Sequence, residues 1–178
     1  MSDGQFVFGY ASLAADLAGG HAADLRGFRR VWGVAMDNRD DLSGYKHYRL
    51  CADGSRPAVF VAFLDVVADA AATTRGLCVP VEAAQLPALD RRERNYDRID
   101  VTDAVHPAPG TVWAYVGTAA GRRRLLHGRD NGRAVVSRDY LERTRAAFAR
   151  LGAAALAEFD RTAAPDGLPV WELERLPS

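Results

Sequence analysis

The sequence of 178 residues has few of the residue types that mark several classes of protein. It contains two cysteines, Cys51 and Cys78, and a single lysine, Lys46. Two cysteines so far apart form neither a disulfide framework nor the CxxC pair of redox and zinc sites, so we expect reduced thiols. Arginine supplies nearly all of the positive charge, which we interpret as coding bias.

Long apolar segments are also missing. The longest apolar run, residues 58–64, is far short of the ~20 residues that a membrane span requires. Near the N-terminus, Asp3 places an acid where a signal peptide needs a cation. We therefore expect a cytoplasmic protein without a membrane span.

The charges balance. Lys and Arg together number 23, and Asp and Glu together also number 23, so the formal net charge is zero. This argues against a protein whose main role is to bind nucleic acid or an anionic membrane. Nucleotide-binding glycine motifs are absent, and the histidines lack metal-ligand spacing. The histidines are His21, His47, His106 and His127. We expect neither a metal nor an organic cofactor.

The length suggests one domain over residues 1–178, and the hydrophobic fraction of 48% is typical of a globular protein. The pattern predicts strands at residues 6–10, 30–36, 58–67, 76–79, 96–101 and 111–116. It predicts helices at residues 81–94, 137–151 and 153–159, the second capped by Ser137. Without regular βαβ alternation, this favours an α+β fold. We divide the domain into a core (5–118), a helical part (119–162) and an extended tail (163–178).

Residues 37–57 form a long, polar and irregular stretch. Loops longer than ~12–15 residues in compact domains are often lids or binding loops, and otherwise are flexible surface excursions. Both interpretations stay open here.

Ser12 follows a predicted strand at a sharp turn, in the sequence Gly9-Tyr-Ala-Ser-Leu13. A serine in that place invites comparison with the nucleophile elbow of hydrolases, but the second glycine of G-x-S-x-G is missing. The spacing assigns no histidine as its base. A serine hydrolase is therefore the least favoured alternative.

The segment Leu89-Asp-Arg-Arg-Glu-Arg-Asn-Tyr-Asp-Arg98 places carboxylates where a helix ends and a strand begins. A carboxylate in that position can face a pocket formed where the two elements diverge. Taken alone, Asp90 and Glu93 are better explained as an ordinary charged helix end, paired with neighbouring arginines.

Together, the two segments resemble the γ-glutamylcyclotransferase superfamily. That family has Tyr-Gly-Ser-Leu or Tyr-Gly-Ser-Asn after its first strand and a helix ending in Leu-Asp-x-x-Glu before a tyrosine. Residues 25–32, 75–80 and 112–116 also look like strands of the family. The resemblance covers approximately residues 5–118.

The resemblance implies a small mixed β-barrel or sheet with flanking helices. It also implies conversion of a γ-glutamyl amide to 5-oxoproline with release of an amine or amino acid. Glu93 would be the general acid and base, and Tyr96 and Tyr115 would line the pocket. The backbone N–H groups of a turn, residues 10–13, would hold the γ-glutamyl group. That turn consists of Tyr10, Ala11, Ser12 and Leu13.

Ala11 departs from the family, which usually has glycine at that position. If the position needs a positive φ or close approach of a ligand, alanine costs roughly 1 kcal/mol or narrows the pocket. A non-catalytic domain that binds a small ligand or a protein through the same pocket is therefore the alternative to an enzyme.

The small-molecule γ-glutamyl substrate and the oligomeric state stay open at this point. The leaving group can be an amino acid, the Cys-Gly of glutathione, a polyamine or part of a secondary metabolite. We expect the 37–57 stretch to make that choice. Its candidate residues are Asn38, Tyr45, Lys46 and Tyr48.

Overall fold

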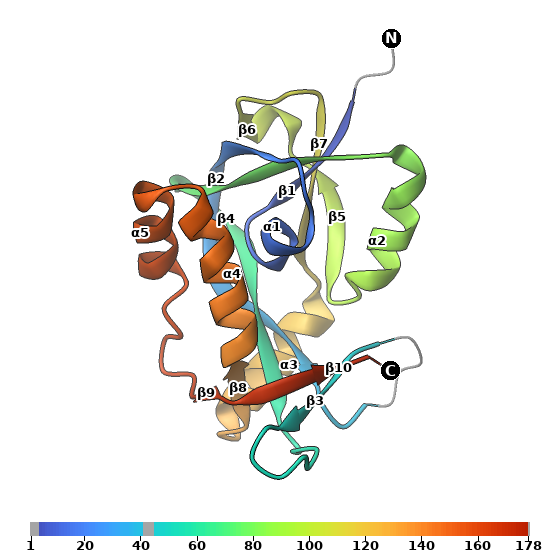
Figure 1. Cartoon of the computed structure of the whole chain (residues 1–178), viewed down its shortest axis with the longest axis vertical. Coiled ribbons are helices and arrows are strands. Elements are labelled where there is room, and N and C mark those ends of the chain that lie inside the picture. The colour runs from blue at the N-terminus through green and yellow to red at the C-terminus, as the bar shows by residue number, and fades with distance from the viewer. Residues whose placement is uncertain (1–3, 41–44, 178) are drawn as a thin grey trace.

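The computed structural model describes residues 4–40 and 45–177, and within them it has an eight-stranded curled sheet surrounded by five α-helices (Figure 1). The path β5-β7-β1-β4-β2-β6 forms most of the sheet, with β8 added to β4 and β9 to β8. The strands are β1 (Gln5–Gly9), β2 (His21–Asp37), β4 (Phe60–Val81), β5 (Tyr96–Asp100), β6 (Val105–His106), β7 (Thr111–Gly117), β8 (Ala134–Ser137) and β9 (Val170–Trp171). The mixture of parallel and antiparallel pairs confirms the predicted α+β class.

The helices are α1 (Ser12–Asp16), α2 (Leu86–Arg92), α3 (Ala119–Asp130), α4 (Arg138–Arg150) and α5 (Ala153–Thr162), with short 3₁₀ turns η1 (Ala83–Gln85) and η2 (Thr102–Ala104). A separate antiparallel ribbon joins β3 (His47–Leu50) to β10 (Leu173–Leu176). None of the helices in the described ranges combines the length and apolarity needed to cross a bilayer.

Two long strands, β2 and β4, form the centre of the sheet. The predicted strands at 58–67 and 76–79 are parts of the single strand β4, so the predicted break between them is wrong. Where β4 pairs with β2, Thr73 lies opposite Arg26 of β2, and the next pair is Ala68 opposite Phe28. The four residues between Ala68 and Thr73 therefore bulge opposite Gly27. They are small and either exposed or half-buried, so they resemble a turn in the sequence.

The predicted helix at 81–94 is shorter than expected. Val81 belongs to β4, η1 follows it, and α2 covers Leu86–Arg92. Pro87 lies at the start of α2, where its missing N–H disturbs no helical hydrogen bond. The helix α1 was not predicted, and neither was β8, which interrupts the predicted helical part. Five-residue and four-residue elements carry too little periodicity to be recognised.

The last two helices and the extended tail form where the local sequence predicts them. The Ser137 hydroxyl accepts a hydrogen bond from the Tyr140 N–H at 3.4 Å and caps α4, as predicted. Gly152 separates α4 from α5 with a φ of 105°, which favours glycine. The alternating tail docks in extended form as β9 and β10, which confirms the prediction for residues 170–176.

The 37–57 stretch is anchored at the places that the structure describes. Asn38 is fully buried, and its Nδ2 donates to the carbonyls of Tyr48 and Pro57, both at 2.9 Å. The Tyr48 N–H donates back to Asn38 Oδ1 at 2.8 Å. Residues 41–44 of the stretch lie outside the described residues.

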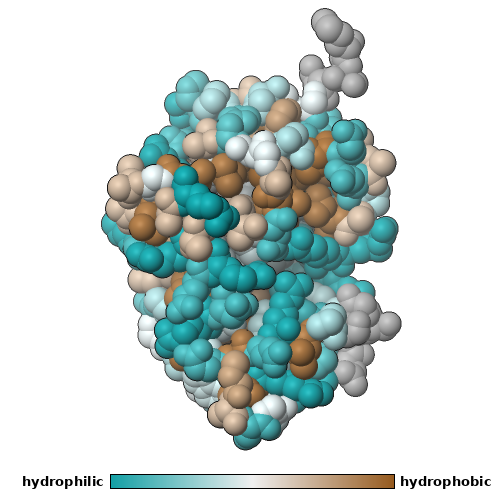
Figure 2. Space-filling model, viewed as in Figure 1, coloured by the Kyte–Doolittle hydropathy of each residue, from teal (hydrophilic) through white to brown (hydrophobic). Residues whose placement is uncertain are grey.

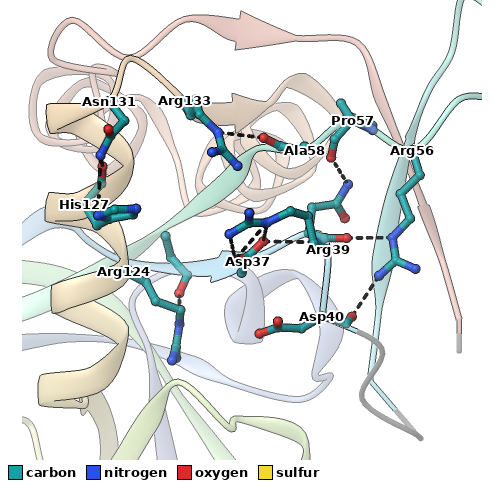
Figure 3. A network of polar contacts seen from close by, with 12 residues as sticks. Asp37, Arg39, Asp40, Arg56, Pro57, Ala58, Arg124, His127, Asn131 and Arg133 are labelled. Carbon is teal, nitrogen blue, oxygen red and sulfur yellow. Dashed lines mark hydrogen bonds and ion pairs between the residues drawn. The ribbon is translucent and has the colours of Figure 1, made fainter.

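Arginines reinforce the two ends of this stretch, as Figure 3 shows. Arg39 forms an ion pair with Asp37, and Arg56 donates to the Asp40 carbonyl at 2.8 Å. Beyond it, Arg133 donates to the Ala58 carbonyl at 2.9 Å. The described part of the stretch is therefore held against the end of the sheet and contributes β3 to the fold.

Candidate functional site

The turn at residues 10–13 connects β1 to α1. Gly9 is required before it, because a Cβ there would lie 2.7 Å from the backbone nitrogen of Ala14. Ala11 caps α1 with a φ of −145°, outside the left-handed region that favours glycine. The alanine that departs from the family pattern is therefore compatible with the backbone of the turn.

A buried arginine holds this turn from behind. Arg30 on β2 donates from Nε to the Tyr10 carbonyl at 2.9 Å and from Nη1 to Glu158 at 2.8 Å. Its guanidinium lies 4.8 Å from the ring centre of Phe148 and 5.1 Å from that of Phe159. Burial lowers the pKa of Arg30, and the Glu158 carboxylate opposes that shift. The backbone of the turn is therefore tied to α4 and α5.

The seven candidate residues from the sequence lie around one small cavity, which we call the inner cavity. Its volume is about 20 Å³, room for about one water molecule. Leu64 and Tyr140 complete the lining, which consists of Tyr10, Ala11, Ser12, Leu13, Leu64, Glu93, Tyr96, Tyr115 and Tyr140.

The tyrosine hydroxyls around the inner cavity bind the scaffold. Tyr10 donates to the Tyr115 carbonyl at 2.6 Å, and Tyr96 donates to the Leu64 carbonyl at 2.7 Å. Tyr115 donates to an Asp90 oxygen at 2.8 Å. Burial raises the pKa of Tyr10 and Tyr96 well above the ordinary value, so both stay neutral donors. Because their hydroxyls are bonded to the protein, these tyrosines present the surfaces of their aromatic rings to a ligand.

Glu93 follows the last turn of α2, and its side chain is 14% exposed. Burial raises the pKa of this carboxyl above its ordinary value. Arg92, whose Nε lies 3.2 Å from Glu93 Oε1, and Lys46 oppose the shift, whereas Asp16 adds to it. A carboxyl in this environment holds a proton more tightly than an exposed one, which suits a group that accepts and returns protons.

A second cavity of about 110 Å³, the outer cavity, adjoins the first. Its lining includes Ser12, Tyr45, Lys46, Tyr48, Arg92, Glu93, Asp139, Tyr140, Arg143 and Arg175. Ser12, Glu93 and Tyr140 line both cavities, so Glu93 lies at their junction. Hydrophilic residues form a band across the middle of the face in Figure 2, below an apolar region in the upper half.

Two arginines of the outer cavity form what we call the arginine–carboxylate network. Arg92 pairs with Asp16 and Glu93. Arg143 reaches Asp16 at 3.6 Å and Asp139 at 3.7 Å. The network fixes the charged wall of the cavity between α1, α2 and α4.

The other sequence alternatives find little support in this geometry. All four histidines are within the described residues, and none lines either cavity, so Ser12 has no histidine as a base. In the ranges 4–40 and 45–177, no group of three His, Cys, Asp or Glu side chains could hold a metal ion.

Several residues around the site were not found by sequence reasoning. Arg30 had a signal, because it alternates with Trp32 and Val34 and so lies on the buried face of its strand. Arg143 and Arg175 had none, because their role depends on the packing of α4 and on the pairing of β10 with β3. Of the residues expected in the 37–57 stretch, Tyr45, Lys46 and Tyr48 line the outer cavity, whereas Asn38 anchors the backbone.

No family model and no curated protein matches the sequence. Solved structures do match the fold. YkqA from Bacillus subtilis has a TM-score of 0.61 at 13% identity over 94% of this chain, which spans 56% of that protein. A γ-glutamyl cyclotransferase has a TM-score of 0.54 at 13% identity, with 91% of this chain and 88% of that chain covered.

A glutathione-specific γ-glutamyl cyclotransferase from yeast has a TM-score of 0.54 at 13% identity, and the match covers 90% of this chain and 97% of that chain. At such identities the likeness shows the fold alone. The protein therefore has the γ-glutamylcyclotransferase-like fold that the two sequence segments predicted.

Proposed function

We propose that the protein is an enzyme of the γ-glutamylcyclotransferase type, which converts a γ-glutamyl amide to 5-oxoproline and releases an amine or amino acid. The observation that carries the proposal is the position of Glu93. This largely buried carboxyl lies at the junction of two cavities and lines one of them together with the turn at residues 10–13. The fold shared with γ-glutamyl cyclotransferases supports it.

In the proposed reaction the α-amine of the substrate attacks its own γ-carbonyl carbon. The new N–C bond closes a five-membered ring, and the amide bond to the leaving nitrogen breaks. Because the attack is intramolecular, a held conformer reaches an effective molarity of ~10⁵ M or more without a nucleophile from the enzyme.

Glu93 would move the proton that this chemistry requires. An α-ammonium cannot attack, so Glu93 first accepts one of its protons and passes it to the departing nitrogen. The ring nitrogen loses a second proton when the lactam forms, and this proton leaves on the released amine as an ammonium. Burial raises the pKa of Glu93 toward that of the groups with which it exchanges, which makes both transfers feasible. The charge of the protein is unchanged after one turnover.

The turn at residues 10–13 would stabilise negative charge on the substrate. The first N–H groups of a helix lack partners within the helix, and here they follow Ala11 at the start of α1. Ser12 lines both cavities, so the turn extends along the junction where Glu93 lies. N–H groups in that place suit the α-carboxylate or the developing oxyanion.

The test is mass-spectrometric detection of 5-oxoproline from a panel of γ-glutamyl amino acids, γ-glutamyl amines and glutathione. Wild type and Glu93→Gln are compared, and we expect the variant to lose about 10²–10⁴-fold in kcat. Glu142→Gln is the matched control, because its side chain is 65% exposed on α4 and lines neither cavity.

Equal turnover by wild type and Glu93→Gln would show that another group moves the proton. No product from either protein, with both folded, would favour the non-catalytic binding domain.

A further inference from the structure

Two cations of the outer cavity stand apart from the arginine–carboxylate network. Lys46 and Arg175 line this cavity, yet neither forms a hydrogen bond or ion pair through its side chain with any described residue. The Lys46 ammonium instead lies 4.0 Å from the ring centre of Phe63. A half-buried ammonium with no carboxylate in direct contact is an incomplete interaction, although Glu93 and Asp16 act on it from a greater distance.

The ribbon of β3 and β10 brings these two cations together. Tyr48 pairs with Arg175 across the ribbon, and Lys46 immediately precedes β3. Tyr48 is buried and lines the outer cavity between them. Strand pairing thus places two positive charges from distant parts of the sequence on one wall, and Figure 1 shows β10 lying beside β3 at that end of the molecule.

The charges around the outer cavity do not cancel. The arginine–carboxylate network has two arginines and three carboxylates, and Lys46 and Arg175 add two cations. Four cations against three carboxylates leave one net positive charge on the side of the ribbon. Burial lowers the pKa of Lys46 to about 8, so bringing an anion to it would relieve an existing cost.

We propose that Lys46 and Arg175 bind a carboxylate of the leaving amine and so select γ-glutamyl amino acids or peptides over γ-glutamyl amines. The inference rests on the proposed function. With the reacting amide beside Glu93, the leaving group extends into the outer cavity toward the ribbon. A leaving group with a second ammonium, such as a polyamine, would meet like charges there.

The experiment uses two ligands that differ by one carboxylate, γ-glutamyl-alanine and γ-glutamyl-ethylamide. We expect wild type to prefer γ-glutamyl-alanine by about 10- to 100-fold in kcat/KM, the range for a charge-assisted hydrogen bond. Lys46→Met should lose most of this preference through a higher KM for γ-glutamyl-alanine. Its kcat/KM for γ-glutamyl-ethylamide should change by a much smaller factor, because Lys46 acts on that ligand only through the pKa of Glu93.

Two further variants separate charge from structure. Lys46→Arg keeps a cation and should retain most of the preference. Arg49→Gln removes an exposed cation from β3 that does not line the outer cavity, and should behave as wild type.

Equal kcat/KM for both ligands in wild type would overturn the inference. The proposed function would still be supported in that case, because 5-oxoproline is formed. Equal losses on both ligands in Lys46→Met would also overturn it, because the cations would then hold the α-carboxylate that the ligands share. A fall in kcat by the same factor on both ligands would overturn the inference, because Lys46 would then act on Glu93 and not on the leaving group.

If neither ligand gives product, the proposed function fails and calorimetric binding decides the inference. About tenfold tighter binding of γ-glutamyl-alanine to wild type, lost in Lys46→Met, would support the carboxylate subsite. Equal affinities would overturn it.

Discussion

The two cavities that meet at Glu93 differ in lining and in origin. Tyrosine rings dominate the inner cavity. Three of their hydroxyls donate to carbonyls or a carboxylate of the scaffold, and that of Tyr140 accepts from the Leu64 N–H. Lys46, Arg175 and the arginine–carboxylate network dominate the outer cavity. Apart from Tyr140, the inner lining comes from the 5–118 core, whereas the outer lining also uses α4 and β10.

This difference suggests a division of work between the cavities. A cavity with room for about one water molecule can meet only the reacting end of a substrate, which is the part that does not vary. A larger cavity with unmatched charge suits the part that varies. In the proposed function, the inner cavity and Glu93 serve the cyclisation, and the outer cavity selects the leaving group.

The largest effect should come from breaking the support of the inner cavity. Arg30→Met removes the guanidinium that holds the Tyr10 carbonyl and leaves Glu158 without its cation. We expect the free energy of unfolding to fall by about 3–5 kcal/mol, because a largely buried carboxylate loses its partner. Urea denaturation measures this change.

A second variant distinguishes the lost ion pair from lost packing. Arg30→Met combined with Glu158→Gln should recover part of the stability, because no buried charge stays unpaired. A loss below about 1 kcal/mol in Arg30→Met would mean that the turn does not depend on this contact.

A smaller effect should come from raising the pH, which should weaken binding in the outer cavity. The pKa of Lys46 is lowered to about 8, mainly by burial, with Arg175 and Arg92 adding to the shift and Glu93 and Asp16 opposing it. Lysine is a cation below its pKa, so carboxylate binding weakens as pH rises through 8. We expect kcat/KM for γ-glutamyl-alanine to fall about tenfold there, relative to γ-glutamyl-ethylamide.

Lys46→Arg provides the control for this pH profile, because arginine stays charged throughout the range. The relative fall should disappear in that variant. A fall that persists unchanged would assign the titration to a different group, since loss of the substrate's own ammonium affects both ligands alike.

The smallest effect should come from restoring the glycine of the family in the turn. Ala11→Gly acts at a φ of −145°, outside the left-handed region that favours glycine. We expect the unfolding free energy to change by less than ~1 kcal/mol and the preferred substrate to stay the same. A new preferred substrate in the ligand panel would show that the Ala11 methyl shapes the pocket.

The fold and much of the inner lining were predictable from local sequence. Strands of alternating or apolar residues, the Ser137 cap and the break at Gly152 all have short-range signals. The 10–13 turn and the Glu93 segment were recognised as a pair, and the structure brings them around one cavity. Their roles in catalysis stay predictions.

The outer lining was not predictable, because its signals are long-range. Arg175 faces Tyr48 through the pairing of two short strands more than a hundred residues apart, which no local pattern encodes. Arg143 lies on α4 among other surface charges and differs from them only in what it packs against. The break predicted inside β4 had the same cause, because only the pairing with β2 shows that the chain continues.

The most direct test of the account is cyclisation in water enriched in ¹⁸O, with γ-glutamyl-alanine as substrate and mass spectrometry of the products. We predict 5-oxoproline and alanine in equal amounts without ¹⁸O in the 5-oxoproline, because the substrate's own amine attacks the γ-carbonyl. Glutamate carrying one ¹⁸O would contradict the account, because water would then have attacked the γ-carbonyl and the enzyme would be a hydrolase.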